Sequence, residues 1–222
     1  GDALYALGQF TEAEKAMNKA LQVPQQSHLG RLEVSTLHML AIVNTYLGNG
    51  SKGLKLAELC HQKAMTVNDA RALLFSELNM ILPLLWAGQF TQAIPYCESA
   101  IQRVDWMSSQ VLSGMSKAFI AYALYFANQT ELAQTYSSSA LKISEKQGTR
   151  LFGGVALGAN ILTQTVSKNQ ANLWVDQGLE LLSQDVISHN YLYFSIGVIP
   201  FLYTHQDQPR LLRLSHQLHR FF

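Results

Sequence analysis

Residues 7–21 read LGQFTEAEKAMNKAL, and a close copy, AGQFTQAIPYCESAI, follows at residues 87–101. Two more distant copies stand at residues 47–61 (LGNGSKGLKLAELCH) and 127–141 (ANQTELAQTYSSSAL). The turn residues of the four copies are separated by a constant step of 40: Gly8, Gly48, Gly88 and Asn128. Self-similarity at a fixed period of roughly 20 to 50 residues is typical of repeat solenoids. The sequence therefore predicts an all-α solenoid built from helix pairs.

Carried along the chain, the period predicts about five to six helix pairs. The repeats are expected near residues 1–27, 28–68, 69–108, 109–148, 149–187 and 188–222. Thr11, followed three residues later by Glu14, reads as a capping box at the start of a helix that Pro24 should end. Ser51, Thr91 and Thr130 are predicted to cap the equivalent helices. Pro95 is expected in a first turn, where a backbone N–H has no helical acceptor.

The fifth pair carries three glycines, Gly153, Gly154 and Gly158, in its predicted first helix over residues 150–166. Glycines in a helix favour close approach of a neighbouring helix. The alternative, a phosphate-binding loop, requires a preceding strand and a Lys-Ser/Thr pair, and both are missing. The 40-residue step predicts the next turn near residue 168, at Ser167-Lys168-Asn169. A second helix over 171–182 and a sixth pair over 189–203 and 209–222 complete the chain.

Composition favours a helical scaffold and excludes some classes of partner. Apolar residues make up 48% of the chain and charged residues 14%, against a usual charged share of about 25%. A net charge of +1 provides no field for nucleic acid, and no apolar run reaches the roughly 18 residues of a membrane span. Gly1 is not an initiator methionine, so we expect a fragment of a longer polypeptide that forms one domain over 1–222. Cys60 and Cys97 fall at positions where other copies carry small residues, which predicts buried free thiols and a cytoplasmic location.

The segment LGQFTEAEKAMNKALQVP resembles the second half of a tetratricopeptide repeat. The residues in the signature places are Gly8, Phe10, Ala13, Met17, Ala20, Leu21 and Pro24. The resemblance implies a right-handed α-α superhelix that binds proteins, although the family's usual unit is about 34 residues and here it is 40. Longer units are similar to the helical-repeat regions of two groups of large bacterial signalling proteins: nucleotide-cyclase-like regulators and ATP-dependent transcriptional activators. The closing repeats of the first group are similar to the end of this chain, in Gly178-Leu179, Ser188-His189-Asn190 and Tyr193-Phe194.

Catalytic and metal-binding patterns are not found, so neither a catalytic residue, a metal site nor a cofactor is predicted. His216 and His219 would share a helix face, with His205 upstream, yet no cysteine or carboxylate is placed to complete a metal site. His189 follows Ser188 at a helix start, where it could act as a base or an anion ligand. No nucleophile or acid accompanies it at a readable spacing, so a structural role at the helix end is preferred.

Binding is the predicted role, because the first helices of tetratricopeptide pairs line a concave groove. Alignment on the turn residues directs eight side chains toward that groove: Ser35, His38, Tyr46, Leu78, Leu82, Trp86, Tyr122 and Tyr125. The alternative for each of them is ordinary core between helices. The leading function is a non-catalytic scaffold for a protein or peptide partner, or for another domain of the same polypeptide. Because clustered lysines and arginines are missing, an acidic tail is the less favoured partner. The second hypothesis is a sensor that binds a small molecule or peptide in the groove.

Overall fold

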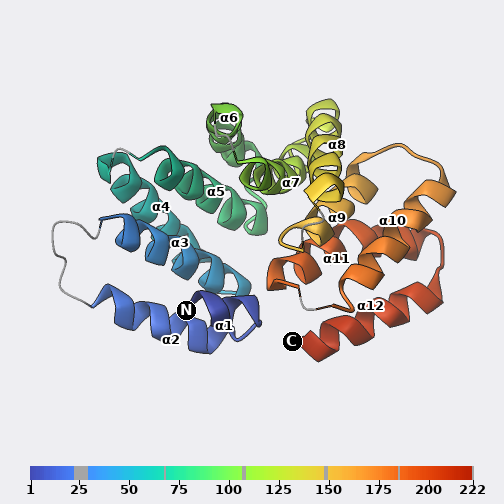
Figure 1. The fold of residues 1–222 in the computed structure, drawn as a ribbon, viewed down its shortest axis with the longest axis horizontal. Coiled ribbons are helices and arrows are strands. Elements are labelled where there is room, and N and C mark those ends of the chain that lie inside the picture. The colour runs from blue at the N-terminus through green and yellow to red at the C-terminus, as the bar shows by residue number, and fades with distance from the viewer. Residues whose placement is uncertain (23–29, 68, 107–108, 148–149, 185, 222) are drawn as a thin grey trace. The chain divides into compact units, whose positions relative to one another are not determined.

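The computed structural model describes residues 1–222 except 23–29, 68, 107–108, 148–149, 185 and 222. Within the described residues every regular element is a helix, so the predicted all-α helical-repeat fold is confirmed (Figure 1). The helices are α1 (Asp2–Ala6), α2 (Phe10–Leu21), α3 (Gly30–Tyr46), α4 (Gly50–Val67), α5 (Ala70–Trp86), α6 (Phe90–Trp106), α7 (Gln110–Phe126), α8 (Thr130–Gln147), α9 (Gly153–Thr163), α10 (Lys168–Leu181), α11 (Ser188–Thr204) and α12 (Gln208–Phe221). No described helix is both long and apolar enough to cross a membrane.

The helices group into two compact units, Gly1–Met107 and Ser108–Phe222. The first unit contains α1 to α6 and the second α7 to α12. In the first unit α3 packs against α2, α4 and α5, and α5 also packs against α4 and α6. In the second unit α9 packs against α7, α8, α10 and α11. The division falls at the predicted end of the third helix pair, and a single domain over 1–222 stays a prediction.

The four predicted turn residues occupy the left-handed backbone region. Their φ values are 76° at Gly8, 80° at Gly48, 71° at Gly88 and 61° at Asn128. Each turn residue donates its N–H to a carbonyl three residues earlier, and the next residue donates to a carbonyl five residues earlier. These bonds satisfy the last free carbonyls of the preceding helix, a role that glycine, or less often asparagine, fulfils without strain. The 40-residue period is therefore confirmed over the first four turns.

The predicted capping box at Thr11 is wrong. Helix α2 begins one residue earlier, at Phe10, and its N-cap residue, Gln9, makes no side-chain capping bond. Helices α4, α6 and α8 begin at the equivalent positions, so Ser51, Thr91 and Thr130 lie inside the helices and do not precede them. The tight glycine turn is the physical reason, because it leaves a single residue between the turn and the next helix.

The earlier start of α6, at Phe90, also changes the position of Pro95 within that helix. It lies inside α6, in the second turn, where an N–H at this residue would have reached the carbonyl of Thr91. The predicted first-turn position is therefore wrong, and α6 continues without that hydrogen bond. Pro24, which was expected to end α2, lies outside the described residues.

The fifth helix pair differs most from its predicted limits. Helix α9 covers only Gly153–Thr163, shorter than the expected 150–166, and the chain is extended at Gln164. Helix α10 begins at Lys168, where a turn was expected, because Ser167 is its N-cap and accepts the N–H of Gln170 at 3.3 Å. A local serine cap is favourable by about 1 kcal/mol, and here it starts the helix earlier than the period predicts.

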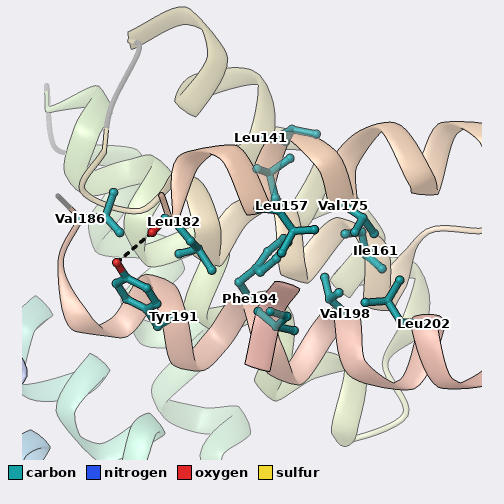
Figure 2. Packing of buried hydrophobic residues seen from close by; sticks show 12 residues of the cluster. Leu141, Leu157, Ile161, Val175, Leu182, Val186, Tyr191, Phe194, Val198 and Leu202 are labelled. Atoms are coloured by element: carbon teal, nitrogen blue, oxygen red, sulfur yellow. Dashed lines mark hydrogen bonds between the residues drawn. The ribbon is translucent and has the colours of Figure 1, made fainter. Parts of the chain in front are cut away.

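The core of the second unit lies between α8, α9, α10, α11 and α12. Its apolar residues surround Phe194, which is fully buried (Figure 2). The Tyr191 hydroxyl donates to the carbonyl of Leu182 at 2.9 Å and so satisfies a polar group at the edge of this core. Apolar burial of this kind, at roughly 25 cal/mol per Å², favours the packed arrangement of the five helices.

The first unit buries both cysteines as free thiols, as predicted. Cys60 packs with Val34, Leu37, Ala64 and Ala72, and its thiol donates to the carbonyl of Val34 at 3.4 Å. Burial raises the pKa of both thiols to about 12. The thiols therefore act as small apolar packing groups.

Buried charge also joins the helices of this unit. Glu77 on α5 is 2% exposed and accepts hydrogen bonds from Arg103 Nε at 2.8 Å and from Ser99 at 2.6 Å, both on α6. A buried carboxylate is tolerated only with such partners. This pair holds α5 and α6 in register without contributing to a surface site.

Candidate functional site

Three of the eight predicted groove residues belong to the core. Leu78 and Leu82 are each 4% exposed and Tyr122 is 1% exposed. The Tyr122 hydroxyl donates to the carbonyl of Tyr193 at 2.6 Å, and burial raises its pKa. For these three side chains the core alternative applies. Tyr125, in the same unit as Tyr122, is partly exposed and lies edge-on to Phe126 with ring centroids 5.5 Å apart.

Tyr46 and Trp86 are brought together in the first unit. Their rings meet edge to face with centroids 6.1 Å apart, and Tyr5 stacks on Tyr46 at 6.2 Å with an interplanar angle of 16°. Phe10 meets Tyr46 from a third side at 5.6 Å. We refer to Tyr5, Phe10, Tyr46 and Trp86 as the aromatic row. The row joins the C-terminal ends of α1, α3 and α5 with the first residue of α2, Phe10, and Trp86 leaves 47% of its surface exposed.

Ser35 and His38 line a pocket of about 450 Å³ in the same unit. The pocket is formed by side chains of α1, α3 and α5, the three helices that come first in their pairs. Its polar and aromatic lining includes Asp2, Arg31, Ser35, His38, Arg71 and Phe75. We refer to it as the α1–α3–α5 pocket.

Sequence reasoning missed the two arginines of this pocket. Arg31 pairs with Asp69 at 2.7 Å, and the Asp69 carboxylate also accepts the N–H of Ala72 at 2.8 Å as the N-cap of α5. Arg71 instead lies over the ring of Phe75, with its guanidinium carbon 5.5 Å from the ring centroid. The two arginines are 40 residues apart and so occupy equivalent positions in neighbouring repeats. This spacing was the sequence signal that could have placed them on the same face.

His38 forms the inner wall of the pocket beside Phe75, with ring centroids 5.3 Å apart. Burial lowers its pKa to about 4, against a smaller opposing effect of a backbone hydrogen bond to Phe75. Its Nδ1 is buried and has no hydrogen-bond partner among the described residues. The imidazole is therefore neutral at pH 7, and the charge of the pocket comes from its arginines and aspartates.

His189 has a structural position at the start of α11. It is 6% exposed, its Nε2 is hydrogen-bonded to the carbonyl of Leu151, and its ring lies edge-on to Phe119. Burial lowers its pKa to about 4, and the bond to Leu151 acts in the opposite direction. The arrangement buries a neutral imidazole at the start of α11, in agreement with the expected structural role at the helix end.

The free energy of unfolding should fall by on the order of 1 to 2 kcal/mol for each of His38 and His189 between pH 7 and pH 5. The folded-state pKa of each imidazole is about 4, against an ordinary value of 6.5. As pH falls below 6.5 the unfolded chain binds protons that the folded chain does not bind until pH 4. Urea unfolding at both pH values measures the loss, and His38→Gln or His189→Gln should reduce it. Equal stability of the unmodified protein at both pH values would contradict the assignment.

Asn190, which follows His189, caps helix α9 from a distance. Its Oδ1 accepts the N–H of Gly154 at 2.8 Å, and its Nδ2 donates to the carbonyls of Arg150 at 3.0 Å and Leu151 at 3.1 Å. The N-cap residue of α9, Phe152, has no side chain that could do this. Asn190 therefore satisfies free backbone groups at the start of α9, which any helix must satisfy.

Gly178 and the Tyr193-Phe194 pair serve packing as well. A Cβ on Gly178 would lie 2.0 Å from the Phe194 ring, so the absent side chain makes room for that ring. The carbonyl of Tyr193 accepts the Tyr122 hydroxyl. Gly178, Asn190 and the Tyr193-Phe194 pair thus form the junction between α9, α10 and α11.

The three predicted packing glycines lie on α9, as expected. A Cβ on Gly154 would lie 2.9 Å from the Cβ of Asn190, and one on Gly158 would lie 2.8 Å from the Cα of Phe194. Close approach of α9 to α11 is therefore confirmed, and Gly153, the first residue of α9, lies within the same helix.

The C-terminal histidines do not gather into a site. His205 is bonded through Nδ1 to the carbonyl of Phe201 at 2.9 Å, and its ring packs on Phe201 with centroids 4.3 Å apart. His216 and His219 are exposed on α12. Over the part of the chain that the structure describes, no three His, Cys, Asp or Glu side chains are placed to hold a metal ion.

No protein-family model and no curated protein matches the sequence. The resemblance to tetratricopeptide repeats and to the two groups of bacterial regulators therefore stays a prediction.

Proposed function

We propose that the chain is a non-catalytic helical-repeat scaffold that binds a peptide segment of a protein partner, or of another domain of its own polypeptide. The observation that carries the proposal is the aromatic row of the first unit, in which Trp86 remains 47% exposed. In this proposal the scaffold belongs to a cytoplasmic bacterial regulatory protein of the tetratricopeptide type. The effector it serves lies outside these residues.

The geometry of the row suits peptide binding. Tyr46 is held between Tyr5, Phe10 and Trp86, so the exposed indole rests on a rigid base. A rigid aromatic side chain loses little conformational entropy on binding and offers a large contact area. Exposed tryptophans at such positions are typical of binding hot spots.

Polar side chains that could act in catalysis are instead used in packing, which supports a non-catalytic role. Glu77 is engaged by Arg103 and Ser99, and His189 by the carbonyl of Leu151. Arg210 bridges α12 and α10 through Asp176 at 2.7 Å. Each of these groups stabilises a helix contact.

Selection of peptides from a random library on the 222-residue chain tests the proposal. Selected peptides should bind Trp86→Ala at least about tenfold more weakly than the unmodified chain, which is roughly 1.4 kcal/mol. Trp106→Ala is the matched control, because Trp106 lies in the same unit and is 92% exposed. Circular dichroism checks that both variants keep their helices.

Two results would contradict the proposal. One is a selection that yields no peptide with measurable affinity, and the other is a set of peptides that bind Trp86→Ala as tightly as the unmodified chain.

A second candidate function, sensing of a small molecule, is favoured by a separate observation. The α1–α3–α5 pocket measures about 450 Å³, within the range of roughly 300 to 1,000 Å³ common for small-molecule sites. It lies on the first helices of the pairs, where the groove was expected.

A further inference from the structure

We propose that the α1–α3–α5 pocket binds a small organic acid, with Arg71 holding the carboxylate and the apolar wall holding the rest of the molecule. The inference deepens the sensing candidate and does not depend on peptide binding by the aromatic row. It assigns a ligand class to a pocket of about 450 Å³.

The charge pattern of the pocket singles out Arg71. Arg31 is neutralised by Asp69 at 2.7 Å, and that carboxylate is also occupied as the cap of α5. Among the described residues no carboxylate pairs with Arg71, whose guanidinium carbon lies over the ring of Phe75, 5.5 Å from its centroid. His38 is neutral at pH 7 because burial lowers its pKa to about 4. Arg71 is therefore the cation of the pocket that can pair with the carboxylate of a ligand.

The position of Arg71 over Phe75 prepares it for a carboxylate. A guanidinium held over the face of an aromatic ring can still direct N–H groups away from the ring, and two of them can donate to both oxygens of one carboxylate. The ring also limits the orientations of the side chain, so less conformational entropy is lost when the ligand binds.

The remaining walls define the body of the ligand. Val34, Met39, Ala72 and Phe75 supply an apolar surface next to the arginine. Asp2 on α1 also lines the pocket and would repel negative charge anywhere in it, so the ligand is expected to carry a single carboxylate, placed at Arg71. A pocket of this volume accommodates a whole small molecule with a ring or short alkyl chain.

Isothermal titration of the 222-residue chain with 3-phenylpropanoate and with its neutral amide, 3-phenylpropanamide, tests the proposal. The acid should bind at least about tenfold more tightly than the amide, since a charge-assisted bidentate contact is lost in the amide. Arg71→Gln should lower the affinity for the acid by about tenfold or more and leave the affinity for the amide unchanged. Arg213→Gln is the matched control, because Arg213 is a half-exposed arginine of the other unit that pairs with Glu180.

The proposal is overturned if acid and amide bind equally, if Arg71→Gln binds the acid as well as the unmodified chain, or if the acid shows no binding up to about 10 mM. The two binding proposals fail separately. Loss of acid binding tracks Arg71→Gln, whereas loss of peptide binding tracks Trp86→Ala.

Discussion

Replacing Gly197 by alanine should lower the free energy of unfolding by about 3 kcal/mol or more. Gly197 on α11 faces Gly158 on α9, and an added Cβ would lie 2.1 Å from the Gly158 oxygen and 2.5 Å from its carbonyl carbon. The atoms it would meet are backbone atoms of a buried helix, which cannot move aside as a flexible side chain does. Relief of the clash requires α9 and α11 to separate, which opens the core around Phe194. Urea unfolding followed by circular dichroism measures the effect.

Gly153→Ala is the matched control for this prediction. Gly153 is a helical glycine of the same unit, and its Cβ would meet only side-chain ends, Leu181 at 2.9 Å and the Ser144 hydroxyl at 3.4 Å. The Leu181 side chain can shift, and alanine is favoured over glycine within a helix by up to about 1 kcal/mol. The net change should be within about 1 kcal/mol. If Gly197→Ala were as stable as Gly153→Ala, the close contact of α9 and α11 would be wrong.

Replacing Asn190 by alanine should lower the free energy of unfolding by about 3 kcal/mol, because several buried backbone groups lose their partner at once. The fully buried amide accepts from Gly154 at 2.8 Å and donates to Arg150 at 3.0 Å and to Ile187 at 3.2 Å. Each buried polar group left without a bond costs roughly 1 to 3 kcal/mol. The N-terminal turn of α9 should loosen first, because its own N-cap residue is a phenylalanine.

Hydrogen exchange separates this local effect from a general loss of stability. In Asn190→Ala the amide of Gly154 should exchange faster than amides in the middle of α9, which keep their helical bonds. Asn169→Ala, at an exposed asparagine in the first turn of α10, should change stability by less than about 0.5 kcal/mol. Unchanged protection of Gly154 in Asn190→Ala would rule out the capping role.

Prediction from sequence succeeded where the structure depends on residues close together in the chain or on the position of a residue within the repeat. The turns at Gly48 and Gly88 could be predicted because a left-handed residue must be one that tolerates positive φ. The burial of Cys60 and Cys97 followed from the repeat register. The capping box at Thr11 was wrong although its sequence pattern is present, because α2 begins one residue earlier, at Phe10.

The candidate site was predicted less well, because exposure depends on which helices cover a residue. Tyr46 and Trp86 lie together in the first unit, as the register suggested, and Trp86 stays exposed. Tyr122 lies one turn earlier on its helix, at the register of Leu82, and is buried by α9 and α11. Arg71 has no motif around it, and only its place beside Phe75 and His38 marks it.

By itself the sequence determined the helical-repeat fold, the 40-residue period and the first four turns, since these follow from backbone preferences and apolar spacing within a few residues. The tertiary structure decided where α9 begins, because that end is capped by an asparagine from α11, 36 residues further along the chain. It also decided which aromatic residues stay exposed and which charges find a partner. Burial and charge pairing depend on contacts between helices, and no local pattern encodes those contacts.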